Sequence, residues 1–418
     1  MNAPASPVSR RTFLQLSAAT GASVVVSAAA GAPLAAAAGP RKRVYVVVVD
    51  GCRPDEITTT LTPRMFALRR GGMNYPNARS LPIMETIPNH TMMMTGVRPD
   101  RSGVPANSIY DRTANVVREL DRPSDLRFPT VLGRLRSLDH TTATVLSKKY
   151  LYGIFGTRAT YRWEPFPLLP GTNHAPDAAT MNATIEMVDN VDPNLVFVNL
   201  GDCDRVGHGD VTGTTVQAAR KDALRSADTQ VGLLVDHLKE TKRWASSVLI
   251  VLADHSMDWS KPDRIVSLAP VFEADPLLAD KVEIAQNGGA DLLYWTGRND
   301  RRADAVARMR ALASNVPGVL ALRDPAMLRL GGRAGDLVAY CRAGWRFSDP
   351  APVSNPIPGN HGHPATLPIP FFINGGSPLV QRGFSGSITT RPTDVAPTIG
   401  RVFGLSAPRG GYDGHSRL

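Results

Sequence analysis

Residues 44–49 read Val-Tyr-Val-Val-Val-Val, and Asp50-Gly51 follows them directly. A β-branched run that is apolar on both faces is typical of a central parallel strand, which helices must cover on either side. This run therefore restricts the chain to an α/β architecture. Because open α/β sheets carry their chemistry at the carboxyl ends of the strands, Asp50 is a candidate functional residue.

The rest of the chain alternates between strand and helix patterns. Further apolar runs predict strands at residues 141–146, 195–200, 248–253 and 368–374. Helices are expected at residues 62–70, 130–138, 178–190, 212–241 and 393–403. Residues 155–180 are rich in Pro, Gly and aromatic residues and are expected to form a loop. This alternation predicts a doubly wound, mostly parallel sheet flanked by helices.

Residues 258–350 are less regular than the segments around them. They contain one helical pattern at 304–313 and one strand pattern at 335–341. We expect them to form a small peripheral lobe over the sheet. The lobe is then part of a single catalytic domain that spans residues 40–418.

Residues 1–39 have the features of a targeting segment. Ser9-Arg10-Arg11-Thr12-Phe13-Leu14 is a twin-arginine pattern, and an Ala-rich, weakly apolar stretch follows it. We expect a cleaved twin-arginine signal and a periplasmic or secreted protein. The alternative is a retained N-terminal anchor. No other window holds the eighteen or more apolar residues of a membrane-spanning helix.

Charge and cysteine content exclude some functional classes. The net charge of +10 favours phosphate-bearing substrates, although many exposed arginines on a soluble protein would give the same value. No cluster of Lys and Arg is interleaved with aromatic residues, so a dedicated nucleic-acid patch is not expected. Three cysteines exclude a disulfide scaffold.

Thr86 precedes a predicted short helix. Pro88 suits the first turn of a helix, an apolar Met run continues it, and Gly96 is placed to end it. Thr86 should therefore lie at a helix N-terminus, where backbone N–H groups favour anions. A metal-activated hydroxyl there is able to attack phosphorus. The alternative is an N-cap threonine with no chemical role.

Acidic residues and histidines follow several of the predicted strands. Asp204 and His208 are four residues apart, which suits a shared metal only in a suitable local fold. Asp254 and His255 are adjacent, so their side chains would point apart in a strand and converge better beyond its end. The histidines of a Gly-flanked loop complete a set of Asp and His residues that suits zinc: Asp50, Asp202, Asp204, His208, Asp254, His255, His361 and His363.

Together these segments resemble the alkaline phosphatase superfamily, and within it the type I phosphodiesterase/nucleotide pyrophosphatase family. That family has a strand ending in Asp-Gly, a nucleophile in Thr-Phe-Pro-Asn-His, an Asn before Tyr/Phe-Asp, and the patterns Asp-x-x-Gly-His, Ser-Asp-His-Gly-Met and Gly-x-His-Gly. The matching segments stand in the same order, at Asp50-Gly51, Thr86 to His90, Asn107, Asp204 to His208, Asp254 to Met257 and His361-Gly362.

The resemblance implies an alkaline phosphatase-like fold and two zinc ions, although other divalent metals are possible. Asp50, Asp254, His255 and the Thr86 oxygen would hold one ion. Asp204, His208 and His361 would hold the other. Thr86 would form a phospho-threonine intermediate, and Asn107 would bind a phosphoryl oxygen. The expected activity is hydrolysis of phosphodiesters or nucleotide pyrophosphates.

The chain departs from the family pattern at two positions. Ser256 replaces a Gly, which we interpret as a local packing change, and Glu85 adds negative charge beside the nucleophile, so that the entrance of the site is expected to differ. The sulfatase pattern Cys-x-Pro-x-Arg is absent, which disfavours an arylsulfatase.

Lys148 and Lys149 resemble lysines that bind the substrate carboxylate in phosphonoacetate hydrolase, or else they form a solvated loop pair. A phosphonoacetate-type C–P hydrolase and a phosphomonoesterase remain alternatives, as does a non-catalytic binding protein. The leaving group and the oligomeric state stay open.

Overall fold

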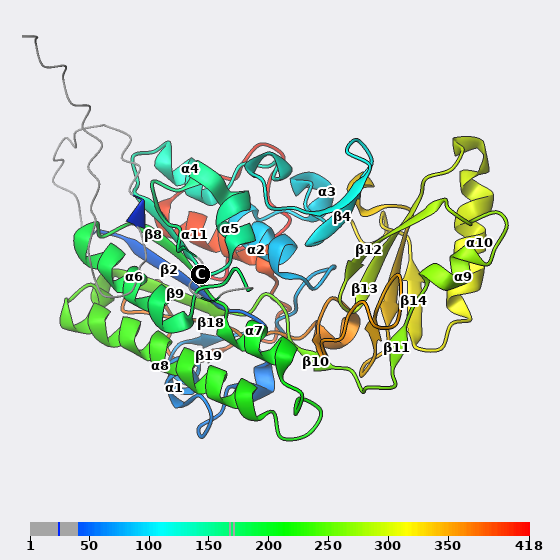
Figure 1. Cartoon of the computed structure of the whole chain (residues 1–418). Coiled ribbons are helices and arrows are strands. Elements are labelled where there is room, and N and C mark those ends of the chain that lie inside the picture. The colour runs from blue at the N-terminus through cyan, green and yellow to red at the C-terminus, as the bar shows by residue number, and fades with distance from the viewer. Residues whose placement is uncertain (1–23, 26–40, 167–168, 170–171) are drawn as a thin grey trace, which may run out of the picture.

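The computed structural model describes residues 24–25, 41–166, 169 and 172–418. Within these residues its centre is a nine-stranded sheet in the order β1-β7-β6-β8-β2-β9-β18-β3-β19 (Figure 1). From β7 to β9 neighbouring strands run parallel, which confirms the predicted mostly parallel α/β sheet. In sheet order, the strands span Val24–Val25, Tyr161–Trp163, Thr142–Leu146, Leu195–Leu200, Arg43–Val49, Ser247–Leu252, Phe371–Asn374, Met73–Asn74 and Phe384–Ser385.

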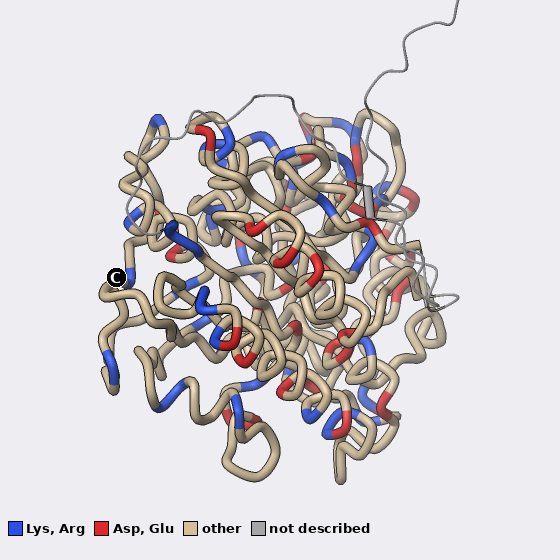
Figure 2. The backbone as a smooth tube through the Cα atoms, turned by 90° about the vertical axis from the view of Figure 1, so that its left-hand side faces the viewer, with Lys and Arg blue, Asp and Glu red and all other residues tan. Residues whose placement is uncertain are grey.

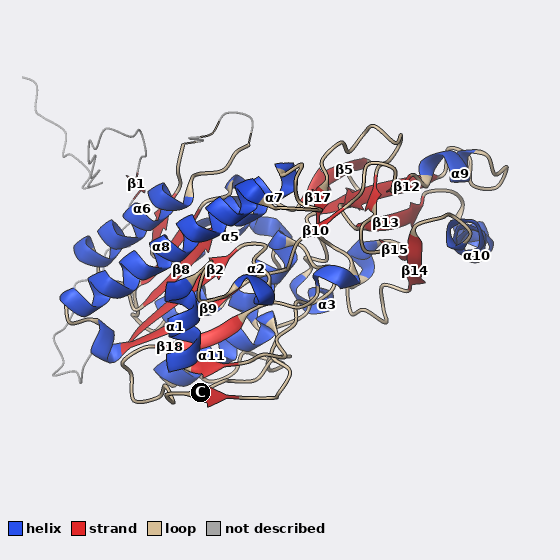
Figure 3. Ribbon diagram, turned by 90° about the horizontal axis from the view of Figure 1, so that it is seen from below, coloured by secondary structure: helices blue, strands red, loops and turns tan. Residues whose placement is uncertain are grey.

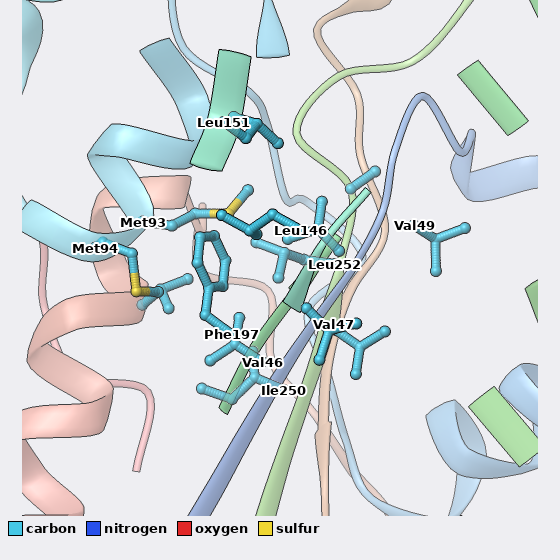
Figure 4. Packing of buried hydrophobic residues seen from close by; sticks show 14 of the residues in the cluster. Val46, Val47, Val49, Met93, Met94, Leu146, Leu151, Phe197, Ile250 and Leu252 are labelled. Carbon is cyan, nitrogen blue, oxygen red and sulfur yellow. The ribbon is translucent and has the colours of Figure 1, made fainter. Parts of the chain in front are cut away.

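Strand β2 lies in the middle of this sheet, as its apolar sequence predicts. Val46 pairs with Phe197 of β8 on one side and with Ile250 of β9 on the other. On the face of the sheet that carries these three residues, the buried neighbours from helices α2 (Thr86–Thr95) and α5 (Lys149–Phe155) are Met93, Met94 and Leu151 (Figure 4). Since β2, β8 and β9 are parallel and in register, the residues that follow them meet at one edge of the sheet.

Helices cover both faces of the sheet, as expected for a doubly wound fold (Figure 3). One layer contains α1 (Pro63–Gly71), α6 (Asp177–Asn190), α7 (Asp202–Gly209) and α8 (Ala218–Glu240). The other layer contains α2 (Thr86–Thr95), α4 (Val131–Arg136), α5 (Lys149–Phe155) and α11 (Val395–Phe403). A short helix, α3 (Pro99–Ser102), and the hairpin of β4 (Ser108–Asp111) and β5 (Val116–Glu119) lie beside the second layer.

The segment 258–350 contains a separate antiparallel sheet in the order β12-β13-β15-β14. Its strands span Val282–Asn287, Ala290–Trp295, Leu337–Cys341 and Val319–Arg323. Helices α9 (Ala269–Glu273) and α10 (Arg302–Ser314) accompany it, and Met309 and Ala313 of α10 belong to its own apolar cluster. Tyr294 and Tyr340 instead join the main core.

Two short ladders close the base of this lobe. Strand β10 (Asp258–Trp259) pairs antiparallel with β17 (Gly359–Asn360). Strand β11 (Ile265–Val266) pairs with β16 (Arg346–Phe347). The chain therefore leaves the main sheet just after β9 and returns to it at the same place.

Several segments differ from the sequence-based expectation. The stretch at 155–180 that was expected to be a loop contains β7, whose Trp163 is buried and pairs with Val145 of β6. Helix α5 precedes it, and no prediction was made for that helix. Both are short, and their packing against β6 outweighs their local Pro and Gly content. Helix α8 begins at Ala218 rather than at 212, because Thr212 and Asp210 form a hydrogen-bonded turn before it.

The predicted signal segment, residues 1–39, lies outside the described residues except for Val24–Val25, so it stays a prediction. Among the described residues, no helix is both long and apolar enough to cross a bilayer. Figure 2 shows Lys and Arg interspersed with Asp and Glu along the backbone on the side turned to the viewer.

Candidate active site

The seven predicted metal-binding residues converge at the carboxyl edge of the central sheet. Asp50 follows β2, and Asp254 and His255 follow β9. These three side chains are fully buried, and their ligand atoms lie within 4.8 Å of one another. A second trio, Asp204, His255 and His361, is also buried, and its ligand atoms likewise lie within 4.8 Å of one another.

The first group surrounds the Nε2 atom of His255. This nitrogen lies 3.6 Å from Oδ1 of Asp50 and 3.3 Å from Oδ2 of Asp254. The hydroxyl of Thr86 lies 3.3 Å from the same nitrogen. Burial and the neighbouring His361 lower the pKa of His255 to about 3, so the ring is neutral and its Nε2 atom can bind a cation.

The second group is built on helix α7, which was not predicted as a helix. Asp204 and His208 are four residues apart, so one helical turn places them on the same face. Nε2 of His208 lies 3.3 Å from Oδ1 of Asp204 and 3.2 Å from Nε2 of His361. The rings of His255 and His361 stack at 3.7 Å, so the two groups are adjacent.

The carboxylates of both groups lack partners on the side that faces the histidines. Oδ1 of Asp50, Oδ1 of Asp204 and Oδ2 of Asp254 are buried, and none has a hydrogen-bond partner among the described residues. Burial, reinforced by the charge on Asp50, raises the pKa of Asp254 to about 7. Since unpaired buried charge is costly, this arrangement fits divalent cations, and oxygen with imidazole nitrogen is a donor set that zinc accepts.

The three imidazoles present the same nitrogen to the cluster. Nδ1 of His208 donates to the carbonyl of Gly359 (2.7 Å), and Nδ1 of His255 to that of Ser256 (3.0 Å). Nδ1 of His361 lies 3.1 Å from the carbonyl of Met84 and 3.0 Å from Oε1 of Glu85. A carbonyl can only accept a hydrogen bond, so each Nδ1 carries its proton and each Nε2 faces the site.

Thr86 is the first residue of α2, and Glu85 is the N-cap residue with an extended backbone. The side-chain oxygen of Asn107 accepts a hydrogen bond from the backbone N–H of Ile87 at 2.7 Å. Asn107 therefore lies beside the helix terminus, as a phosphate-binding role requires. The helix N-terminus and the Thr86 hydroxyl face the same cluster.

Lys148 and Lys149 occupy different environments. The Lys148 ammonium is fully buried, 2.8 Å from Oδ2 of Asp50 and 2.7 Å from Oδ2 of Asp204. Burial lowers its pKa, but the two carboxylates outweigh burial and raise the pKa well above its ordinary value. Lys149 begins α5, and its side chain is exposed. The structure thus brings Lys148, but not Lys149, to the cluster.

Sequence reasoning missed a polar network behind the site. Nδ2 of Asn199 donates to Oδ2 of Asp50 at 2.8 Å and lies 3.0 Å from Nε2 of His90. Nδ1 of His90 in turn contacts the carbonyl of Thr86 at 2.9 Å. The polar Asn199 inside the otherwise apolar strand Leu195–Leu200 is the sequence signal from which this network could have been predicted.

Two other candidates lie away from the cluster. His363 is buried and contacts Asp258 at 3.0 Å, at the base of the lobe. The carboxylate of Asp202 instead accepts a hydrogen bond from the backbone N–H of Asp177, and the backbone N–H of Asp202 donates to the carboxylate of Asp177.

Comparison with known proteins shows similarity to one enzyme family over most of the chain. The family model for type I phosphodiesterase/nucleotide pyrophosphatase matches residues 44–363. The human ectonucleotide pyrophosphatase/phosphodiesterase family member 5 is 22% identical over 88% of this chain and 75% of its own length. The bovine bis(5'-adenosyl)-triphosphatase of family member 4 is 21% identical over 90% of this chain and 81% of its own length. A venom phosphodiesterase of Macrovipera lebetinus is 26% identical, but this chain covers 27% of its length.

Solved structures show the same fold. Murine family member 5, an inactive threonine-to-alanine variant in complex with AMP, has a TM-score of 0.73 and 20% identity, with 89% of this chain and 97% of that chain covered. Phosphonoacetate hydrolase from Sinorhizobium meliloti in complex with phosphonoformate has a TM-score of 0.66 and 18% identity, with 88% and 96% covered. The chain belongs to the type I phosphodiesterase/nucleotide pyrophosphatase family, a family of metal-dependent hydrolases in the alkaline phosphatase superfamily.

Proposed function

We propose that this chain is a two-zinc hydrolase that cleaves phosphodiester or nucleotide pyrophosphate bonds through a phospho-threonine intermediate. The observation that carries the proposal is the 3.3 Å contact between the Thr86 hydroxyl and His255, at a helix N-terminus beside two adjoining groups of Asp and His ligands. An inactive threonine-to-alanine variant of the murine relative was solved in complex with AMP. Both supports point to a threonine that acts on nucleotide phosphates.

The residues have distinct roles in this mechanism. Asp50, Asp254 and His255 would hold one zinc ion, and Asp204, His208 and His361 the other. The ions would supply charge that stabilises alkoxide and phosphoryl oxygens at neutral pH. Thr86 gives up its hydroxyl proton and its oxygen attacks phosphorus in line with the leaving oxygen. The bond between phosphorus and the leaving oxygen breaks, and that oxygen takes up a proton as it departs.

Asn107 orients the substrate phosphate. Its side-chain oxygen is held by the N–H of Ile87, which leaves its Nδ2 group to donate to a phosphoryl oxygen. The N–H groups at the start of α2 add further positive potential for the same anion. Water, activated at the group formed by Asp204, His208 and His361, then attacks the phosphorus of the phospho-threonine. The bond between phosphorus and the Thr86 oxygen breaks, which releases the phosphate product and restores the Thr86 hydroxyl.

A phosphonoacetate-type C–P hydrolase is the second candidate. The likeness to phosphonoacetate hydrolase favours it, with Lys148 and Lys149 as carboxylate-binding residues. We rank it second because the Lys148 ammonium already contacts Asp50 and Asp204. A phosphomonoesterase is the third.

A substrate panel on zinc-loaded protein tests the proposal. We expect bis(p-nitrophenyl) phosphate and a dinucleotide to be hydrolysed faster than p-nitrophenyl phosphate, with phosphonoacetate unchanged. Release of phosphate from phosphonoacetate as the fastest reaction would instead establish the second candidate. No turnover of any phosphorus compound by protein with a full zinc complement would overturn the hydrolase assignment.

We also propose that residues 1–39 act as a twin-arginine signal that delivers the enzyme to the periplasm or the medium. Replacing Arg10 and Arg11 together by Lys should retain the unprocessed chain inside the cell. Normal export of that variant would refute the signal assignment.

A further inference from the structure

Glu85 does not face the entrance of the site, where its charge would meet the substrate. Its side chain is buried, with 3% of the residue exposed, and Oε1 lies 3.0 Å from Nδ1 of His361. The residue before the nucleophile therefore contacts a ligand of the second metal group. This contact links Thr86 to the group that is otherwise built from α7 and the loop at residues 359–363.

The three imidazoles of the site differ in the partner that holds them. His208 and His255 each donate from Nδ1 to one backbone carbonyl. His361 alone among these three has a carboxylate beside its Nδ1, in addition to the carbonyl of Met84. A carboxylate partner fixes the orientation of a metal-bound imidazole and makes its other nitrogen a stronger donor.

The local backbone is shaped for this contact. Met84 and Gly362 form an isolated antiparallel bridge, which brings Glu85 beside His361. Gly362 has φ +101°, and a Cβ atom there would lie 2.5 Å from the carbonyl oxygen of Asn287 and 3.2 Å from Oε1 of Glu85. The positive φ and the nearby Asn287 carbonyl therefore require glycine in the part of the loop that lies beside the Glu85 carboxylate.

We propose that Glu85 is a positioning residue that orients His361 and sets the metal affinity of the group formed by Asp204, His208 and His361. The inference rests on the proposed function, because it requires a metal ion at that group. It assigns no contact between Glu85 and the substrate. The group formed by Asp50, Asp254 and His255 is not affected.

The test measures metal binding by the full chain rather than activity. Glu85→Gln keeps the size of the side chain and removes its charge, and Glu85→Ala removes the contact. Glu119→Gln is the matched control, because Glu119 is an exposed carboxylate at the end of β5 that contacts none of the three imidazoles. Zinc content by elemental analysis and affinity by competition with a chromogenic chelator give the number of ions and the strength of each site.

We expect wild type and Glu119→Gln to bind two zinc ions with the same affinities. Both Glu85 variants should bind one ion as before and the other about 10- to 100-fold more weakly. Cobalt-substituted protein should show the change in the visible spectrum of one site only. If Glu85→Ala does not fold, Glu85→Gln decides the question alone.

Unchanged affinity at both sites in Glu85→Gln would overturn the inference and leave the proposed function standing. An equal loss in Glu119→Gln would also overturn it, since the effect would then be long-range charge rather than the contact with His361. Wild-type protein that binds no zinc, cobalt or manganese would overturn the proposed function and this inference together.

Discussion

The ammonium of Lys148 lies 2.8 Å from Oδ2 of Asp50, whose other oxygen faces His255 at 3.6 Å. The same ammonium contacts Oδ2 of Asp204 at 2.7 Å. One buried cation thus neutralises the outer oxygens of a carboxylate from each metal group. The inner oxygens remain available to metal ions.

Replacing Lys148 by Met should therefore destabilise the metal-free protein. Breaking a buried ion pair leaves charge uncompensated, and the free energy of unfolding should fall by about 3–5 kcal/mol. Zinc should restore part of this loss. Denaturant titration with and without zinc measures the effect, with exposed Lys149→Met as the control that should change stability by less than about 0.5 kcal/mol. Equal stability of the two variants would contradict the structural role of Lys148.

Replacing Thr86 by Ala should abolish turnover while zinc content stays at two ions. Loss of a nucleophile lowers kcat by at least about a thousandfold. Thr86→Ser should keep part of the activity because the hydroxyl remains. Hydrolysis of bis(p-nitrophenyl) phosphate measures the effect. Robust turnover by the Ala variant would remove Thr86 from the nucleophile role.

Replacing a single carboxylate should remove one metal site at a time. Asp204→Asn weakens the group on α7, and Asp254→Asn weakens the group beside Thr86. Each variant should retain one tightly bound zinc ion. In wild type, zinc at 100 times its dissociation constant should add about 2.7 kcal/mol of stability per site. Loss of both ions in either variant would show that the sites are not separable.

The lobe offers a pH-dependent prediction at Asp291, far from the metal ligands in the sequence. Both oxygens of this buried carboxyl lack partners among the described residues, and burial, then the nearby Asp349, raise its pKa well above the ordinary value. The folded state therefore keeps the proton to a higher pH than the unfolded chain, whose Asp pKa is about 3.9. The free energy of unfolding should fall as the pH rises from about 4 through the folded-state pKa.

Asp291→Asn should remove that fall, because the amide is neutral at every pH and has no proton to lose. We expect the variant to be about 1–3 kcal/mol more stable than wild type at pH 8, with a smaller difference at pH 4. Denaturant titrations of wild type and variant at pH 4 and pH 8 measure this difference in stability. A variant that is less stable at pH 8 would contradict the assignment of a neutral Asp291.

The sequence predicted the parts of the site that depend on single strong signals. The valine-rich strand located Asp50, and the Thr86 segment located a helix terminus, because both patterns are local. Helix α7 and the position of Lys148 depend on tertiary contacts that no local pattern encodes. The position of His361 beside Glu85 also depends on the bridge between Met84 and Gly362, which joins residues almost three hundred positions apart and could not be predicted from a local pattern.

Secondary structure, too, was predicted where a local pattern is strong and missed where tertiary contacts decide it. Long apolar runs such as β8 and β9 were predicted, while the three-residue strand β7 was not, because its pairing with β6 decides its conformation. In the antiparallel ladder of the lobe, β15 was predicted at 335–341, while β12, β13 and β14 were missed for the same reason. Its segments have weak individual patterns, and only their mutual pairing makes them strands.

The antiparallel pair of β10 and β17 has a consequence for how this enzyme can diversify. It closes the lobe at its base, between His255 on the outgoing chain and His361 on the returning chain. The turn at residues 287–289 reaches back to this closure, where the N–H of Gly289 donates to the carbonyl of His361. The part of the lobe beyond that turn can change in length and sequence without altering the spacing of the two histidines. The outer part of the lobe can therefore diverge in sequence while the ligand geometry is inherited intact.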